Sequence, residues 1–168
     1  MKQSVTINQL TTGNTFHVRG RVFFSQVSRK TTDSERELLN TGKKHKITKN
    51  YTSMSIYDAR VLIENPQEPT LEDIYGLEHL YKSNKYSGKC FTAMNKLDFI
   101  PSIYVINKTE KDTTYDTIQL TDELLRGTDV TLILCVCENG KNKSDKVVAL
   151  SSVLINQPKF KCYKPKNN

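Results

Sequence analysis

The sequence predicts a small, mostly antiparallel β-barrel with short helices, and three observations lead to this prediction. Residues 15–27 alternate apolar and polar side chains, as a half-buried strand does. Several shorter runs rich in β-branched and aromatic residues follow, separated by polar turns. No strand–helix–strand repeat with glycine-rich turns occurs, so a parallel sheet is not expected.

The first strand is unusually long for a β-strand, which typically has five or six residues. The expected inward set is Phe16, Val18, Gly20, Val22 and Phe24, and the outward set is His17, Arg19, Arg21, Phe23 and Ser25. Gly20 lies in the middle, where glycine often marks a bend or the close approach of another backbone. A long strand bent at a glycine can serve both sheets of a barrel. This favours a five-stranded barrel of the OB type, with a small β-sandwich as the alternative.

Residues 28–50 are polar and basic, and apart from a short helical turn at Ser34–Leu39 they predict a long loop. Loops of this length in a compact domain are usually functional or disordered. Residues 51–63 predict the second strand, with Met54 and Ile56 inward. Its outward residues are Tyr51, Ser53, Ser55 and Tyr57.

Two helices are expected in the second half of the chain. A helical insertion near 66–82 has its amphipathic part at 70–82, where Thr70 precedes Asp73 at the spacing of a capping box. Residues 121–127 predict one or two turns, since Thr121 can cap a helix and Gly127 can end it.

Further strands are expected at residues 88–96, 99–107, 128–138 and 147–155. Residues 128–138 are apolar on both faces and predict the central buried strand. Pro101 makes the second of these regions, 99–107, an edge strand or delays its start. We expect one domain over residues 1–157 and a basic tail at 158–168.

Composition excludes several classes of protein. With 36% hydrophobic and 26% charged residues, the chain is too apolar for a disordered protein and too polar for a membrane protein. The N-terminal sequence MKQSVTINQL does not predict a secretory signal. Cys90, Cys135, Cys137 and Cys162 form no C-x-x-C motif, and they predict reduced thiols and a cytoplasmic location. Cys135 and Cys137 are expected on one face of a strand as core thiols, with a metal pair or a disulfide as the alternative.

The net charge of +7 is unevenly distributed. Residues 1–57 carry 10 basic and 3 acidic groups, whereas residues 58–80 carry 1 and 6. Such a directed field makes a polyanion the first partner to consider. A basic protein with ordinary solvated faces is the alternative.

The outward face of the first two strands combines cations with aromatic rings. The candidate nucleic-acid-binding residues there are Arg19, Arg21, Phe23, Tyr51 and Tyr57, and the basic loop adds Arg29, Lys30, Lys43, Lys44, Lys46 and Lys49. Guanidinium groups bind phosphates bidentately, and rings stack unpaired bases at roughly 1–3 kcal/mol each. Because a duplex hides its base faces, this set favours a single strand. As alternatives, the tyrosines cover sheet surface or pack under the 28–50 loop, Arg19 and Arg21 pair with the acidic residues of 58–80, and the lysines are simply solvated.

No enzyme is predicted. The motifs H-E-x-x-H, G-x-S-x-G and GxxxxGK[ST] do not occur. The carboxylate pairs Glu72–Asp73 and Asp122–Glu123 stand at expected helix starts, where the helix dipole accounts for them. Accordingly, neither a cofactor nor a metal is expected.

The C-terminal third carries short motifs in a characteristic order: P-x-I-Y from Pro101, L-x-x-G-x-x-V from Leu124, a Gly/Lys turn, and A-L-x-x-V-L-I from Ala149. Together with the opening V-R-G-R-V-F-F, this order resembles the OB-fold single-stranded-DNA-binding proteins of phages and of Gram-positive conjugative plasmids. The likeness covers about two-thirds of the chain. Three departures stand out: residues 58–98 have no counterpart, tryptophan is absent, and KPKNN replaces the acidic tail that recruits partners in bacterial housekeeping members.

This resemblance implies a largely sequence-independent single-stranded-DNA-binding protein that protects or organises DNA during conjugative transfer or replication of a mobile element. The expected partner is single-stranded DNA, and no membrane is expected. A homo-oligomer along the strand stays open. The alternatives are an RNA-binding protein and a protein-interaction module that uses the helix at 70–82 and an apolar edge near Ile103–Ile106.

Overall fold

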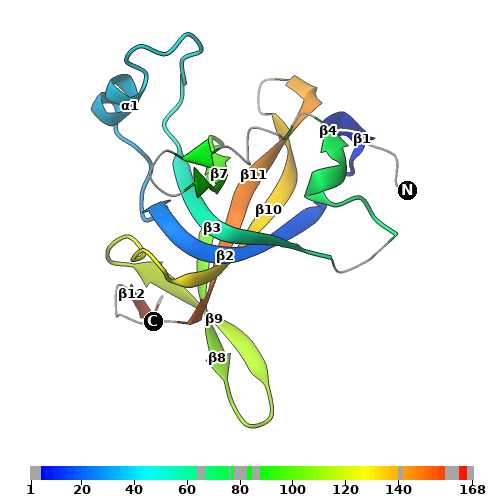
Figure 1. Ribbon diagram of the computed structural model, residues 1–168, viewed down its shortest axis with the longest axis vertical. Coiled ribbons are helices and arrows are strands. Elements are labelled where there is room, and N and C mark those ends of the chain that lie inside the picture. Colours follow the sequence, from blue (N-terminus) through cyan, green and yellow to red (C-terminus); the bar gives the residue numbers. More distant parts are fainter. Residues whose placement is uncertain are drawn as a thin grey trace.

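The computed structural model describes residues 5–63, 67–75, 77, 83–84, 88–139, 142–157 and 163–165. Within these residues the chain is mostly β, with one short α-helix (Figure 1). The elements are β1 (Val5–Thr6), η1 (Ile7–Gln9), β2 (Thr15–Gln26), α1 (Asp33–Leu39), β3 (Thr52–Leu62), η2 (Leu71–Asp73), β4 (Ile74–Tyr75), β5 (Ser83–Asn84), β6 (Gly88–Lys89), β7 (Phe91–Asn95), β8 (Ser102–Lys108), β9 (Thr113–Leu120), β10 (Asp129–Asn139), β11 (Asn142–Gln157) and β12 (Tyr163–Pro165). None of the helices in these ranges is both long and apolar enough to cross a membrane.

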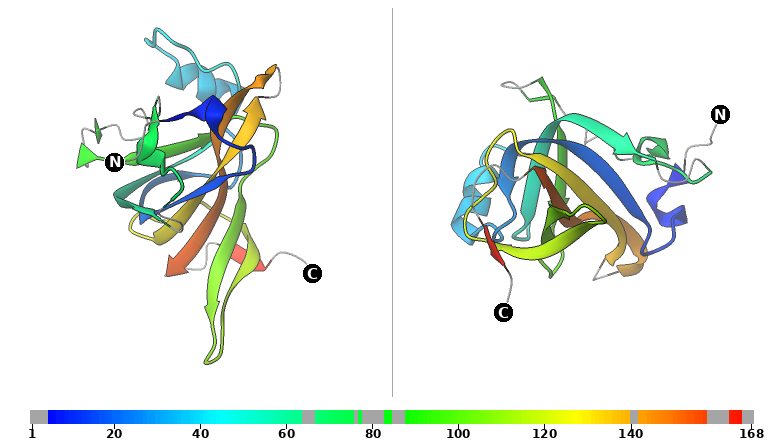
Figure 2. Two further views of the ribbon diagram at one scale, coloured as in Figure 1. Left: turned by 90° about the vertical axis from the view of Figure 1, so that its right-hand side faces the viewer. Right: turned by 90° about the horizontal axis from the view of Figure 1, so that it is seen from below.

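One sheet dominates the molecule, with the strand order β12-β9-β8-β11-β10-β2-β3-β7. All its pairings are antiparallel except that of β8 with β11. The sheet curls around its apolar face instead of lying flat, as the right-hand view in Figure 2 shows. Two small pairs, β1–β4 and β5–β6, complete the described strands.

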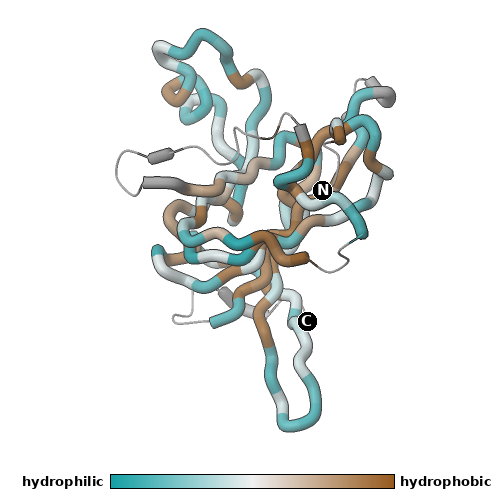
Figure 3. The backbone as a smooth tube through the Cα atoms, turned by 45° about the vertical axis from the view of Figure 1, so that its right-hand side comes forward, coloured by the Kyte–Doolittle hydropathy of each residue, from teal (hydrophilic) through white to brown (hydrophobic). Residues whose placement is uncertain are grey.

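The predicted mostly β fold is confirmed, but the prediction of a five-stranded closed barrel is wrong. The main sheet has eight strands, and within the described residues its ladder ends at β7 on one side and β12 on the other. The β8–β9 hairpin adds strands beyond β11 and projects from the body with a hydrophilic tip (Figures 1 and 3). At the other edge, the side-chain amide of Asn95, at the end of β7, donates to the Leu150 carbonyl of β11 over 2.9 Å. The two strands are therefore linked there by a side chain.

The core lies on the inner face of the curled sheet. Its largest fully buried side chains include Phe91, Met54, Ile56, Leu132, Leu134, Leu150, Ile155, Val18 and Val22. Burying each such side chain contributes about 1.5–3 kcal/mol. The predicted central strand is confirmed, because β10 lies between β2 and β11. The inward positions predicted for Met54 and Ile56 are confirmed as well.

A β-bulge in β2 reverses the predicted alternation near its end. Val22 pairs with Ile56 and Phe24 with Ser55, so β2 contains one extra residue between these pairs. Phe24 is therefore 50% exposed and Ser25 is buried, opposite to the prediction. A bulge depends on the register with the neighbouring strand, which alternation within one segment does not contain.

Of the three helical segments predicted, only the short turn in the basic loop is helical as expected. The turn at Ser34–Leu39 is confirmed as α1, which begins with a capping box between Thr32 and Glu35. The helix predicted at 70–82 is wrong over Leu71–Tyr75, where a single 3₁₀ turn leads into β4. The reason is long-range pairing, since Ile74 and Tyr75 extend alongside Val5 and Thr6. The Thr70–Asp73 capping box itself is present, and residues 76 and 78–82 lie outside the described part.

Residues 121–127 form a turn and no helix. The carboxylate of Glu123 instead accepts hydrogen bonds from Ser25, Val27 and Ser28 at the end of β2. Gly127 has φ +92°, and its N–H donates to the Val22 carbonyl over 2.8 Å. The predicted role of Gly127 as a helix stop is therefore wrong, and the glycine instead takes a left-handed conformation in a turn.

The remaining strand predictions are confirmed with shifted bounds, and Pro101 stands directly before β8. Strand β9 was not predicted, because only Ile118 in it is buried and the residues show no alternation. The apolar edge expected near Ile103–Ile106 is not an edge, because β8 pairs with β9 and β11. In the predicted tail, residues 163–165 pair with β9, while 158–162 and 166–168 lie outside the described part.

The described cysteines are free thiols. Cys90 is buried, and Cys135 and Cys137 are half-buried on the outer face of β10 instead of in the core. Burial raises the pKa of Cys137 to about 11. Cys162 lies outside the described residues. Among those residues, no group of three or more His, Cys, Asp or Glu side chains is placed to hold a metal ion.

Candidate nucleic-acid interface

The outer face of β2 and β3 brings together three of the predicted binding residues. Arg19 lies opposite Arg60, and Arg21 lies opposite Tyr57. Directly opposed residues of antiparallel strands share one face of the sheet. A groove of about 240 Å³ opens here, lined by Arg19, Gly20, Arg21, Asp58, Arg60 and Asp129.

A second β-bulge shapes this groove and explains why Arg60 was not predicted. Between the pairs Arg19–Arg60 and Arg21–Tyr57, β3 contains one extra residue. Asp58 takes up the bulge with a left-handed φ of +56°. Plain alternation from Tyr57 places Ala59 outward, whereas the bulge turns Arg60 outward and Val61 toward the core. The polar D-A-R sequence inside a strand is the one available signal, since aspartate is depleted in strands.

Arg19 is held by Asp129 from the first position of β10. Its Nε donates to Oδ1 over 3.0 Å and its Nη2 to Oδ2 over 2.9 Å, which is a bidentate ion pair. These bonds hold the pKa of Asp129 below its ordinary value and raise that of Arg19. The Asn156 amide also donates to Asp129 Oδ1 over 3.1 Å and to Thr131 Oγ1 over 2.9 Å. Arg19 thus pairs with an acidic residue, although not with one of the predicted 58–80 segment.

Arg21 and Arg60 differ from Arg19 because both are exposed and without a polar partner within the described residues. Their guanidinium donors therefore remain available to a ligand. Arg21 also contributes to lowering the pKa of Asp129 through its charge, which places it within electrostatic range of the Arg19–Asp129 pair.

The predicted aromatic residues are divided by the structure. Tyr57 is half-buried on the outer face, and its hydroxyl lies 3.9 Å from the position that a Cβ on Gly127 would take. Phe23 is half-buried beneath Arg126, whose guanidinium carbon is 4.5 Å from the ring centroid, so one face of this ring is occupied. Phe24, which was predicted inward, is half-exposed instead.

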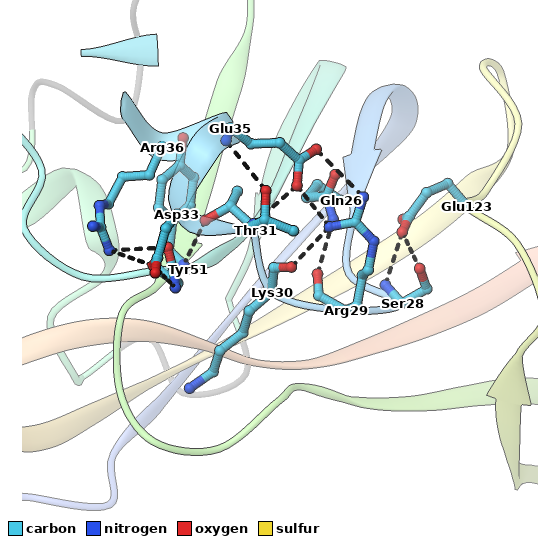
Figure 4. Close-up of polar contacts among 12 residues, drawn as sticks. Gln26, Ser28, Arg29, Lys30, Thr31, Asp33, Glu35, Arg36, Tyr51 and Glu123 are labelled. Atoms are coloured by element: carbon cyan, nitrogen blue, oxygen red, sulfur yellow. Dashed lines mark hydrogen bonds and ion pairs between the residues drawn. The ribbon is translucent and has the colours of Figure 1, made fainter. Parts of the chain in front are cut away.

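The outward position predicted for Tyr51 is wrong. Its side chain is 7% exposed, and the base of the 28–50 loop closes over it. Thr31 N–H donates to the Tyr51 carbonyl over 2.9 Å, and Tyr51 N–H donates to Thr31 Oγ1 over 3.2 Å (Figure 4). Burial raises the pKa of Tyr51, and Glu35 adds to the effect. This residue anchors the loop and does not offer a ring to a base.

Two predicted cations, Arg29 and Lys30, stabilise the loop itself. Arg29 forms an ion pair with Glu35 over 2.8 Å, and Lys30 Nζ donates to the Leu97 carbonyl over 2.9 Å. A second network joins Arg36 and Asp33 to the Asn50 amide, with donor–acceptor distances of 3.0 Å and 2.8 Å to Asn50 (Figure 4). The loop is therefore tied down at both ends.

The other predicted lysines of the loop are exposed. The side-chain ammonium groups of Lys43, Lys44, Lys46 and Lys49 have no polar partner within the described part of the chain. The Asn40 side chain clasps this segment: its Nδ2 donates to the Ile47 carbonyl over 2.8 Å, and Ile47 N–H donates to its Oδ1 over 2.9 Å. We call residues 41–49 the lysine loop. In the ribbon this loop extends beyond the end of β2 (Figure 1).

The structure thus separates the predicted cations into a groove on the sheet and a lysine loop beyond its end. No family model matches the chain, and neither a curated protein sequence nor a solved structure matches it. The resemblance to OB-fold single-stranded-DNA-binding proteins stays a prediction that rests on the short motifs of the sequence. A proposal for function therefore has to be built on the groove, the nearby rings and the lysine loop.

Proposed function

We propose that the chain binds single-stranded DNA without sequence preference along the outer face of β2 and β3. The observation that carries this proposal is the groove of about 240 Å³ on β2 and β3, which we call the arginine groove. There Arg21 and Arg60 present guanidinium groups that have no polar partner among the described residues, beside Tyr57. Cations next to an accessible ring suit a chain that has both phosphates and unstacked bases. The net charge of +7 supports the same class of partner.

The strand arrangement is compatible with an elaborated OB-type fold. We infer that β2, β3, β7, β10 and β11 correspond to its five strands, with β8, β9 and β12 as additions. OB folds are partly open barrels that bind oligonucleotides on the face of their second and third strands and with the loop between their first and second strands. Under this correspondence the second and third strands are β3 and β7, so the groove on β2 and β3 shares β3 with that face. The corresponding loop is residues 27–51, which contains the lysine loop. Protection of transferred or replicating DNA of a mobile element is the corresponding biological role.

The proposal is tested by fluorescence anisotropy with a labelled single strand, the matching duplex and an RNA of the same sequence, each at several salt concentrations. We expect the single strand to bind most tightly, with a log–log salt slope of about −0.7 per neutralised phosphate. Tighter binding of the RNA would favour the alternative of an RNA-binding protein, because the 2′-hydroxyl is the group that distinguishes the two. Absence of binding to either oligonucleotide would overturn the proposal.

Two variants test whether binding takes place on the β2–β3 face. Tyr57→Leu removes a stacking ring and should weaken single-strand binding about tenfold without changing the salt slope. Lys111→Gln removes an exposed cation at the tip of the β8–β9 hairpin, remote from β2 and β3 in the ribbon (Figure 1), and serves as the control. Equal effects of both variants would contradict binding on the β2–β3 face.

A further inference from the structure

The three arginines of the arginine groove differ in whether a carboxylate of the protein already binds them. Asp129 engages both Nε and Nη2 of Arg19 at 2.9–3.0 Å, and Asn156 holds the same carboxylate from the other side. One of the two bidentate edges of the Arg19 guanidinium, Nε with Nη2, is therefore already filled by a carboxylate of the protein. This pair is fixed to neighbouring strands and forms one wall of the groove.

The other two arginines are diagonal neighbours across the strand pair. Arg60 lies opposite Arg19, and Arg21 is two residues further along β2 on the same face. Diagonal positions of adjacent strands are within reach of long side chains. Since both residues line one groove of about 240 Å³ and neither has a polar partner among the described residues, their guanidinium groups can converge on one small anion.

The shape of the groove follows from Gly20. The missing side chain would point inward, where a Cβ would lie 2.7 Å from the Tyr57 carbonyl oxygen and 2.9 Å from Ile56 Cδ1. Glycine therefore lets β3 approach β2 closely, and the bulge at Asp58 turns Arg60 to the groove side. The backbone geometry of β2 and β3 thus places Arg21 and Arg60 on the same side of the groove.

We infer that this groove is a binding site for one phosphate group, held jointly by Arg21 and Arg60, and that the Arg19–Asp129 ion pair takes no part in binding it. The inference deepens the proposed function, on which it rests for the source of the phosphate. Asp58 is the one carboxylate in the groove without an arginine partner. Its charge opposes the anion, and its role is to adopt the left-handed backbone of the bulge, which aspartate tolerates.

The first test uses pyrophosphate as a free anion and follows the arginine Nε–H signals of the full chain by NMR. We expect the signals of Arg21 and Arg60 to shift on titration while that of Arg19 stays in place. Asp58→Asn keeps a residue that tolerates the bulge and removes the opposing charge, so it should tighten pyrophosphate binding severalfold. A shift of Arg19 equal to that of the other two, or no shift at all, would overturn the inference.

The second test compares two double variants in single-strand binding. Arg21→Gln with Arg60→Gln removes the phosphate site, and Arg19→Gln with Asp129→Asn replaces the internal ion pair by neutral amides at no net change of charge. We expect the first to lose more than tenfold in affinity and to reduce the salt slope by about 0.7, the value for one phosphate, although two charges are lost. The second should remain within about twofold of the unaltered protein. A slope change of about 1.4 in the first would mean that the two arginines bind separate phosphates, contrary to the inference.

Failure of this inference is distinguishable from failure of the proposed function. If the unaltered chain binds single strands and the Arg21/Arg60 variant binds them equally well, the phosphate site is wrong and the function stands. If pyrophosphate shifts Arg21 and Arg60 but no oligonucleotide binds, the phosphate site stands and the function is wrong.

Discussion

Gly20 and Tyr57 approach so closely that a Cβ on residue 20 would lie 2.7 Å from the Tyr57 carbonyl oxygen. The contact joins the middle of β2 to the residue just before the bulge in β3. Because the obstructing atom belongs to the backbone, a side chain at position 20 cannot be accommodated by a rotamer change. The groove and the curl of the sheet both depend on this contact.

We therefore expect Gly20→Ala to lower the free energy of unfolding by about 3 kcal/mol, measured by urea denaturation. Gly42→Ala is the comparison, since Gly42 has a positive φ of +76°, which Gly20 has not, and a Cβ there would meet nothing within 4 Å. That variant should cost only the left-handed backbone term of about 1 kcal/mol. An equal decrease in the free energy of unfolding in the two variants would show that the close approach to Tyr57 does not contribute to stability.

Glu123 is predicted to be a structural acceptor for the end of β2. Its carboxylate accepts from Ser25 Oγ at 2.7 Å, Val27 N at 2.8 Å and Ser28 N at 3.0 Å, and also from the Ser28 hydroxyl. Glu123→Gln turns an amide toward some of these donors and should destabilise the fold by about 2 kcal/mol. Hydrogen exchange at the Val27 and Ser28 amides should accelerate.

The neighbouring Asp122→Asn variant is the control for this prediction. Asp122 is exposed, and its carboxylate accepts from the Glu123 backbone N–H at 2.8 Å. It makes no contact with β2 in the described structure and should leave exchange at Val27 unchanged. An equal effect of both variants would point to net charge and not to the hydrogen bonds of Glu123.

Alternation predicted the interior of the sheet well, because burial of Val18, Val22, Met54 and Ile56 follows directly from the period of a strand. Alternation does not give the register between neighbouring strands. Both bulges depend on how β2 and β3 align, and they reversed Phe24 and brought out Arg60. The helix predicted at 121–127 is wrong for a related reason. The donors that bind the Glu123 carboxylate lie almost a hundred residues away in sequence, so a local pattern does not reveal them.

The candidate site could be predicted where it depended on strand faces alone. Arg19, Arg21 and Tyr57 do share a surface, as expected from their spacing. Tyr51 was misplaced because the loop that buries it has no periodicity from which its path could be read. The pairing of Arg19 with Asp129 required knowledge that β10 lies beside β2, which is a property of the whole sheet.

Glu35 gives the α1 cap a defined pH dependence. The Arg29 ion pair and hydrogen bonds from Thr32 lower the pKa of Glu35 from about 4.5 to about 2. Since the folded protein favours the carboxylate, the stabilising contribution is complete above the ordinary pKa and is lost as the pH falls toward 2. We expect the protection factors of the α1 amides, which compare exchange with that of an unstructured chain at the same pH, to fall over this range. Glu35→Gln should abolish this change in protection, whereas Glu37→Gln on the same helix should retain it. A Glu35→Gln protein with the unaltered pH profile would show that Glu35 is not the titrating group.

The clasp made by Asn40 predicts that the lysine loop contributes to binding partly through its preorganisation. Asn40 is 7% exposed and bonds both the N–H and the carbonyl of Ile47, which encloses Lys43, Lys44 and Lys46. Asn40→Ala removes both bonds but keeps every charge. Single-strand affinity should therefore fall severalfold, because the loop must be ordered on binding, while the salt slope should stay the same.

Replacing the three lysines by glutamine should instead reduce the slope by about 2, at 0.7 per phosphate. If Asn40→Ala changes the slope as well, the lysines contact phosphate only in the clasped loop. If neither variant alters affinity, the lysine loop has no part in binding and the arginine groove acts alone.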